Sequence, residues 1–311
     1  MVSRFLSSLS LILIAALVAP AVCAQAPIEE PQQTFRAAVD LVTIQASVRD
    51  RHGRPLRGLS PADFEVRDNG EVRPVLSLRA DLHAPISLVI LVDMSGSMGG
   101  ATKIGMVRQA YDSLLTQLRE GDEVALLTFD SQLHERQDFT RNIAQLRGAL
   151  SDFEPFGTTS LYDATAATAR KLADRSAAHK AIIVLTDGLD KSSTMTASQV
   201  SGLASSIDVP LYVVATVPAV DQRALMENAE RPSHGAADLR DLADWTGGHV
   251  VFASTMTETN IVASGLVDEL RQQYVLAIEA TGQHEWRRLD VRVRVKHPAT
   301  TVKARSGYFG G

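Results

Sequence analysis

The chain has 311 residues, of which 31 are Lys or Arg and 36 are Asp or Glu, giving a net charge of −5, and it contains one cysteine. This length is sufficient to bury a sizeable hydrophobic core, and a single cysteine excludes a disulfide framework. The acidic balance and the scattered basic residues argue against a nucleic-acid-binding protein. We therefore expect a globular protein that is stabilised by core burial.

Residues 1–24 have the layout of a secretory signal peptide, because Arg4 precedes an apolar stretch over residues 5–18 and small residues follow up to Ala24. We predict cleavage after Ala24 and export to the periplasm or the medium. The apolar stretch is shorter than the roughly 20 residues that a transmembrane helix requires, and no later segment is longer, so we expect no transmembrane segment in the mature chain. Cys23 is disfavoured as a lipoprotein anchor because the branched Val22 precedes it.

Residues 25–37 are rich in proline and glutamate and are predicted to form a flexible linker. Residues 38–83 are predicted to form a small β unit. In its first strand Val42, Ile44, Ala46 and Val48 alternate with mostly polar residues, as in a half-buried strand. Further on, the Asn-Gly in residues 68–70 predicts a hairpin between strands 64–67 and 72–78.

Residues 84–257 alternate apolar strands with amphipathic helices, which is typical of an α/β fold with a doubly wound, mostly parallel sheet. The clearest helix has apolar residues at spacings of three and four from Ile104 to Leu118. The other predicted helices cover 143–153, a segment from about 160, and 239–245. Strands are predicted at 86–92, 124–129, 181–185, 211–216 and 249–252, with a hairpin-like return over 133–138.

Residues 258–311 are predicted to contain a helix over 258–273 and strands over 274–279 and 289–295. These strands are too few to be stable alone, so we expect them to complete the N-terminal β unit as a β-sandwich, with the α/β domain inserted between the two halves. Basic residues alternate with apolar ones along the last strand. For this basic set we favour a solvated sheet face over an anion-binding face. The set comprises Arg287, Arg288, Arg292, Arg294 and Lys296.

Three loops rich in oxygen donors follow or face strands of the predicted parallel sheet. Residues 93–97 (Asp-Met-Ser-Gly-Ser) follow the first strand, residues 156–164 contain Thr159, and residues 186–188 place Asp187 after a third strand. The carboxyl ends of the strands meet at one edge of such a sheet, so these loops should converge. An oxygen-only donor set suits magnesium, calcium or manganese rather than zinc. The loop over residues 93–97 in isolation would more often be a capped turn, because Asp and Ser commonly begin helices.

Together these loops resemble the metal-ion-dependent adhesion site of the von Willebrand factor A domain, with its Rossmann-like fold. The resemblance implies that Asp93, Ser95, Ser97, Thr159 and Asp187 bind the metal. The second glycine of the family's threonine loop is Thr158 here, so Thr158 is an alternative to Thr159. The flanks, at residues 48–55, 59–70 and 303–309, resemble those of exported bacterial proteins related to this family.

The resemblance implies a non-enzymatic, exported adhesion module that binds an Asp or Glu carboxylate of a protein or peptide partner through the ion, with magnesium first and manganese or calcium as alternatives. One other hypothesis is a structural envelope component with a fold-stabilising metal. A metal-dependent hydrolase or phosphatase is less favoured, because Ser95 stands where a haloacid-dehalogenase-type enzyme needs a second aspartate, and no nucleophile elbow is present. We expect Asp163, in the first turn of the predicted helix, to complement the helix dipole rather than bind metal, Asp190 likewise to have no ligand role, and Asp130 and Ser131 to rim the site.

Overall fold

The computed structural model describes residues 41–80, 82–151, 154–177, 179–188, 190–206, 208–217, 236–281, 285–294 and 300–309. The predicted signal peptide, its cleavage site, Cys23 and the linker lie outside the described residues. All the described residues fall in the unit that spans residues 39–311. Within them, no helix combines the length and apolar character that crossing a membrane requires.

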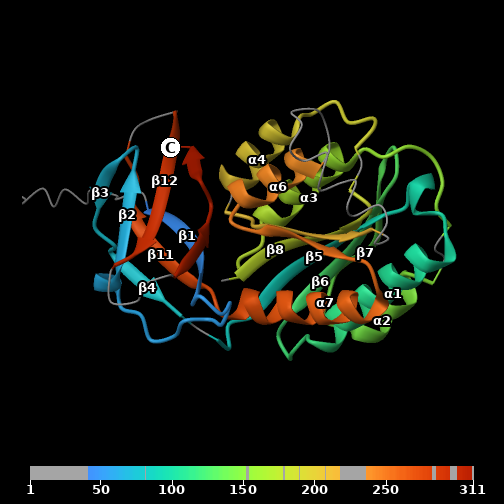
Figure 1. The fold of residues 1–311 in the computed structure, drawn as a ribbon, viewed down its shortest axis with the longest axis horizontal. Helices are drawn as coiled ribbons and strands as arrows, with labels where there is room; N and C mark the ends of the chain where they lie inside the picture. The colour runs from blue at the N-terminus through green and yellow to red at the C-terminus, as the bar shows by residue number, and fades with distance from the viewer. Residues whose placement is uncertain are drawn as a thin grey trace, which may run out of the picture. The chain divides into compact units, whose positions relative to one another are not determined.

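A six-stranded sheet in the order β10-β9-β8-β5-β6-β7 forms the centre of the α/β part (Figure 1). Its strands are β5 (Ile86–Asp93), β6 (Glu123–Phe129), β7 (Leu133–Thr140), β8 (His179–Thr186), β9 (Leu211–Thr216) and β10 (His249–Ala253). All pairings are parallel except that of β6 with β7. Every residue of β5 and β9 is buried, because helices cover both faces of a parallel sheet.

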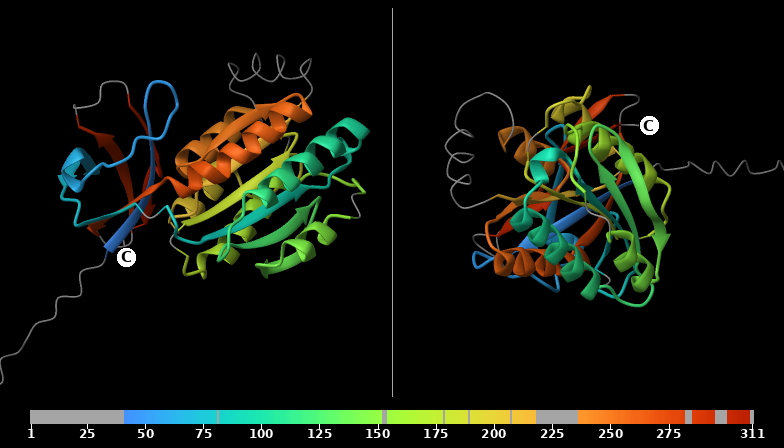
Figure 2. Two further views of the ribbon diagram at one scale, coloured as in Figure 1. Left: turned by 90° about the horizontal axis from the view of Figure 1, so that it is seen from below. Right: turned by 90° about the vertical axis from the view of Figure 1, so that its right-hand side faces the viewer.

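Helices cover the two faces of this sheet in separate layers, as Figures 1 and 2 show. One layer contains α1 (Ala101–Thr116), α2 (Ile143–Ala149) and α7 (Met256–Arg271), and the other contains α3 (Leu161–Ala173), α4 (Ala197–Ser206) and α6 (Ala236–Trp245). In α1 the predicted stripe is confirmed, because Val107, Tyr111 and Leu114 are buried in the core. The α/β fold predicted from the strand and helix pattern is therefore correct.

Two four-stranded sheets form the β-sandwich, in the orders β13-β1-β11-β4 and β14-β12-β2-β3. The N-terminal strands are β1 (Leu41–Arg49), β2 (Phe64–Asp68), β3 (Glu71–Arg73) and β4 (Ser77–Arg79). The C-terminal strands are β11 (Tyr274–Glu279), β12 (Trp286–Val293), β13 (Thr301–Ala304) and β14 (Gly307–Phe309). Antiparallel pairing of β1 with β11 and of β2 with β12 joins the two ends of the chain. The predicted sharing of one sandwich is therefore present.

The predicted hairpin is also present, with Asn69 (φ 48°) and Gly70 (φ 88°) in the left-handed region between β2 and β3. The second predicted strand, residues 72–78, is wrong as one element, because β3 and β4 lie in different sheets. Pro74 separates them, since proline has no N–H for the ladder. Three further elements were not predicted: α4, which is rich in serine, and the short strands β13 and β14.

Arg287 does not belong to the solvated face predicted for the basic residues of the last strand. Its Nε donates to Oδ1 of the fully buried Asp68 at 2.8 Å. Burial opposes the ionisation of Asp68, but donors from Thr281, Arg287 and Tyr308 outweigh it and lower the pKa of this carboxyl. Arg288 and Arg292 are exposed, as predicted. Lys296 lies outside the described residues.

A buried guanidinium connects the sandwich to the helices of the α/β part. Arg305 is 4% exposed, and it donates to the carbonyl oxygens of Ser205 in α4 and Thr43 in β1. Its Nε lies 3.5 Å from Oδ1 of Asp208. One buried cation thus faces three acceptors from separate elements, so removing it takes a charged donor from each of the two carbonyls and leaves the Asp208 carboxylate without its nearby cation.

We predict that Arg305→Met lowers the free energy of unfolding by about 2–4 kcal/mol, because it removes the cation beside the partly buried Asp208 carboxylate and a charged donor from two carbonyls. Urea unfolding of the full chain measures the change. The control is Arg292→Met, whose exposed side chain pairs with the partly exposed Asp290 and whose loss should be without measurable effect. Equal stability of the Arg305→Met protein and the parent would contradict the role given to Arg305.

Candidate metal site

Asp93 is the last residue of β5 and is fully buried. Its Oδ1 accepts from the backbone N–H of Ser95 at 2.8 Å, and its Oδ2 accepts from the hydroxyl of Thr186 at 2.6 Å. Burial raises the pKa of Asp93 to about 6, the negative charge of Asp187 adds to this, and the hydrogen bonds from Thr186 and Ser95 oppose it. A cation beside the two carboxyl groups would favour their ionised form.

The serine loop leaves β5 through a short helical turn, Gly96–Met98, that leads into α1. The hydroxyl oxygens of Ser95 and Ser97 lie 3.1 Å apart. The backbone N–H of Gly96 donates to the carbonyl of Gly157 at 3.0 Å, and a Cβ at position 96 would lie 3.3 Å from that oxygen. Glycine therefore permits the serine loop and the threonine loop to approach closely.

Two further backbone hydrogen bonds fix the threonine loop. The N–H of Phe156 donates to the carbonyl of Met94 at 2.7 Å, and the N–H of Ser160 donates to the carbonyl of Asp130 at 2.8 Å. Thr159 is buried in this loop. Thr158 is exposed, and its hydroxyl accepts from that of Ser192 at 3.0 Å. The structure thus places Thr159 inside the loop cluster and the alternative Thr158 at its surface.

Asp187 follows β8 and is 5% exposed. Its Oδ2 accepts from the ammonium of Lys103 at 2.9 Å. Its Oδ1 is buried and has no hydrogen-bond partner among the described residues. A buried carboxylate oxygen without a donor is energetically costly unless a ligand or ion satisfies it, so the donor set fits a hard cation.

Lys103 is the site residue that the sequence analysis missed. Besides pairing with Asp187, its Nζ donates to the carbonyl of Ser97 at 2.9 Å, so it connects the first and third loops. Its position offered a signal, because Lys103 lies in the first turn of α1, where the helix dipole disfavours a cation unless a carboxylate is close.

The neighbouring aspartates Asp163 and Asp190 accept hydrogen bonds from backbone N–H groups of nearby segments. Asp190 Oδ1 accepts from the N–H of Leu161 at the start of α3. The N–H groups of Thr194 and Met195 donate to Asp163; burial opposes the ionisation of this carboxyl, but these bonds prevail and lower its pKa. Within the described parts of the chain, no group of three or more His, Cys, Asp or Glu residues is arranged to hold a metal. The candidate site is of another kind, with two carboxylates and several hydroxyls.

Hydrogen bonds thus join Asp93, Ser95, Ser97 and Asp187 at one edge of the sheet, and Thr159 enters through the loop held by Gly96. Residues 88–201 match the family model of the von Willebrand factor type A domain, so the chain contains a domain of this family. The elements that carry the site, from β5 to α4, lie almost wholly within this match.

Individual relatives share little sequence identity with this chain. The minor fimbrium subunit Mfa5 of Porphyromonas gingivalis is 25% identical over 166 residues, which is 50% of this chain and 13% of that protein. The crystal structure of the vWF domain of this type V pili tip protein matches 34% of this chain and 39% of that chain, with 26% identity and a TM-score of 0.32. A von Willebrand factor type A structure from Catenulispora acidiphila matches 89% of this chain and 65% of that chain, with 14% identity and a TM-score of 0.51, and supports the fold.

Proposed function

We propose that the protein is an exported binding module that holds a divalent cation, magnesium in the first place, and uses it to bind a carboxylate of a protein partner. The observation that carries this proposal is the buried Oδ1 of Asp187, which has no donor among the described residues and whose carboxylate lies close enough to the buried Asp93 to raise its pKa. Two buried carboxyl groups with one ammonium partner attract further positive charge.

Each residue has a distinct role in the proposal. The hydroxyls of Ser95, Ser97 and Thr159 would hold the ion directly, whereas Asp93 and Asp187 would act through bound water or through hydrogen bonds to the hydroxyls. Neutral direct ligands leave the charge of the cation largely uncompensated at the surface. When bound, the ion would supply a position for a hard oxygen ligand such as an Asp or Glu side chain.

The relatives support binding rather than catalysis. Mfa5 is a minor fimbrium subunit and a type V pili tip protein, so its similar segment belongs to a pilus component. Export of the present chain is proposed from the layout of residues 1–24 and agrees with that setting. The proposal therefore assigns no catalytic residue to this chain.

Metal binding is predicted to depend on the two buried carboxylates. In calorimetric titration with magnesium or manganese, Asp93→Ala and Asp187→Ala should each weaken binding by at least about tenfold, since each removes a negative charge from the ion's surroundings. The matched control is Asp163→Ala, which removes a carboxylate that serves Thr194 and Met195. Binding by the Asp93 and Asp187 variants at the parent's affinity would show that the site is misassigned.

Lys103 gives a prediction of the opposite sign. Its ammonium lies 2.9 Å from Asp187 Oδ2 and repels a cation that approaches the same carboxylate. Lys103→Met should therefore tighten magnesium binding several-fold in the same titration. Weaker binding by this variant would mean that Lys103 is needed to organise the loops.

Partner binding is predicted to require the ion, Thr159 and Phe156. Phe156 is 82% exposed although its backbone is fixed beside the serine loop, so it offers an apolar contact next to the carboxylate position. Immobilised peptides that carry Asp or Glu beside an apolar residue should bind the full chain with magnesium and not with chelator. Matched Asn or Gln peptides should not bind.

In this assay Thr159→Ala should abolish peptide binding. Thr158→Ala, which changes the exposed neighbouring residue, should have little effect. Phe156→Ser should weaken peptide binding about tenfold without changing the magnesium affinity, because burial of a Phe side chain contributes about 1.5–3 kcal/mol. The control is Leu76→Ser, which alters a 52% exposed apolar residue of the sandwich and should leave peptide binding unchanged. Peptide binding that persists in chelator would favour a structural ion over a recognition site.

A further inference from the structure

A second recess, separate from the metal loops, lies where the helices α4 and α6 meet the strands β12 and β14. It has a volume of about 690 Å³, within the usual range for small-molecule sites. Helix residues, two tryptophans, one arginine and a serine before β14 line it. These residues are Ser198, Ser201, Gly202, Ser205, Trp245, Trp286, Arg288 and Ser306.

The chain has two tryptophans, and both line this recess. Trp245 is 39% exposed and Trp286 is 41% exposed. The ring of Trp286 packs on Gly307 of the neighbouring strand, where a Cβ would overlap it. Phe309 is the cross-strand partner of Trp286 and is 57% exposed. Large aromatic surface held in place but left accessible is typical of a binding site.

Hydrogen bonds make the polar part of the recess rigid. The carbonyl of Trp245 accepts from the hydroxyl of Ser205 at 2.9 Å, and from the N–H and hydroxyl of Ser306 at 2.8 and 3.2 Å. The Ser306 hydroxyl has thus committed its proton, but its oxygen can still accept. Ser198, exposed on α4, adds a second hydroxyl.

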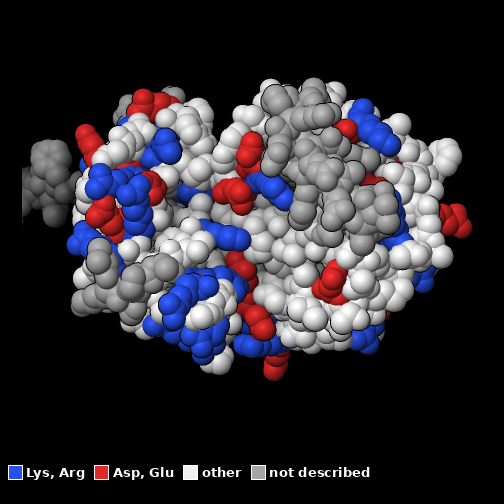
Figure 3. All heavy atoms as spheres, viewed as in Figure 1, with Lys and Arg blue, Asp and Glu red and all other residues white. Residues whose placement is uncertain are grey.

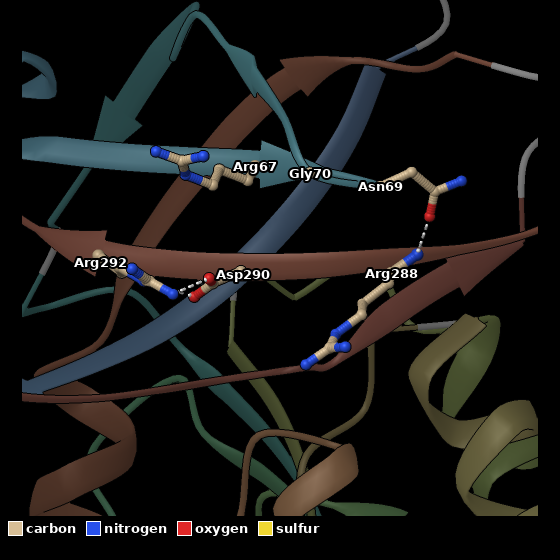
Figure 4. A pocket seen from close by; sticks show the side chains of 6 residues that line it. All are labelled: Arg67, Asn69, Gly70, Arg288, Asp290 and Arg292. Atoms are coloured by element: carbon tan, nitrogen blue, oxygen red, sulfur yellow. Dashed lines mark hydrogen bonds and ion pairs between the residues drawn. The ribbon is translucent and has the colours of Figure 1, made fainter.

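Arg288 also lines an adjoining hollow of about 660 Å³ on the outer face of β12 and β2, shown in Figure 4. Arg67 and Arg292 also line that hollow, but each pairs with a carboxylate, Glu65 at 2.7 Å and Asp290 at 2.5 Å. In Figure 4 the Arg288 side chain extends away from Arg67. None of the ion pairs among the described residues includes Arg288. Figure 3 shows charges of both signs around β2, β3 and β12.

We propose that this recess binds an acidic saccharide, with the tryptophans against the apolar C–H face of the sugar and Arg288 on its carboxylate. The lining of the recess complements such a ligand chemically. The oxygens of the held Ser306 and the exposed Ser198 can accept from sugar hydroxyls, which rotate to donate, and the guanidinium of Arg288 suits a carboxylate bidentately. An acidic peptide fits less well, because the hydroxyls of Ser201, Ser205 and Ser306 already donate to backbone carbonyls. The donors left in the lining are Arg288, the two indole N–H groups and the Ser198 hydroxyl, too few for a row of peptide carbonyls.

Because both tryptophans line the recess, the emission of the full chain reports on it directly. The full chain is titrated with oligosaccharides of galacturonic and of glucuronic acid, and with their neutral galactose and glucose counterparts. Excess chelator is present throughout, so that a carboxylate cannot bind through a metal and the result is independent of the proposed metal-dependent function. A saturable emission change with an acidic oligosaccharide, at least about tenfold tighter than with its neutral counterpart, is expected.

Variants separate this recess from general surface charge. Arg288→Gln should remove the preference for the acidic over the neutral saccharide, and Trp286→Ala should weaken both by about tenfold in calorimetry. The control Arg292→Gln, which removes a paired arginine of the adjoining hollow, should keep the preference. No saturable change with any acidic oligosaccharide, equal losses in the two arginine variants, or tighter binding of an Asp-rich peptide would each overturn the proposal.

Discussion

The structure depends on a buried carboxylate at the end of a parallel strand. Asp93 has no solvent exposure, and Thr186 and Ser95 hold its two oxygens. These bonds join β5 to the end of β8 and bend the chain into the serine loop. Burying such a group opposes its ionisation, so the surrounding loops must supply donors or positive charge. The candidate metal site follows from this requirement.

Topology brings the remaining groups to the same place. In the order β9-β8-β5-β6 the carboxyl ends of parallel strands share one edge, so Asp93 after β5 and Asp187 after β8 become neighbours although they are far apart in sequence. The Gly96 to Gly157 bond then adds the threonine loop. A rigid sheet fixes the positions of the loops at its edge. Residues of these loops can therefore present specific oxygen donors although the loops have no regular secondary structure.

Much of this was predictable from sequence, for identifiable reasons. Strands of the parallel sheet are mostly apolar runs, and α1 shows a helical period. The type of these elements and their positions along the chain therefore follow from pattern alone. The three loops follow from the strand ends. The short strands β13 and β14 and the serine-rich α4 were missed because each gains its stability from partners distant in the chain, which no local pattern reports.

The surroundings of two side chains, Arg287 and Lys103, could not be predicted from the periodicity of the sequence alone. Arg287 alternates with its neighbours as an inward residue would, but a charge inside a sandwich is credible only once Asp68 is known to face it. Lys103 points to the loops of the candidate metal site because Asp187 and the carbonyl of Ser97 converge on it, and that convergence belongs to the tertiary fold.

The central claim concerns the position of one ion, and anomalous X-ray scattering tests it most directly. In crystals of the full chain grown with manganese, the account predicts a strong anomalous peak in contact with the hydroxyls of Ser95, Ser97 and Thr159, with Asp93 and Asp187 around it. A map without a peak at this edge of the sheet, at manganese concentrations that saturate any binding seen in solution, would contradict the account.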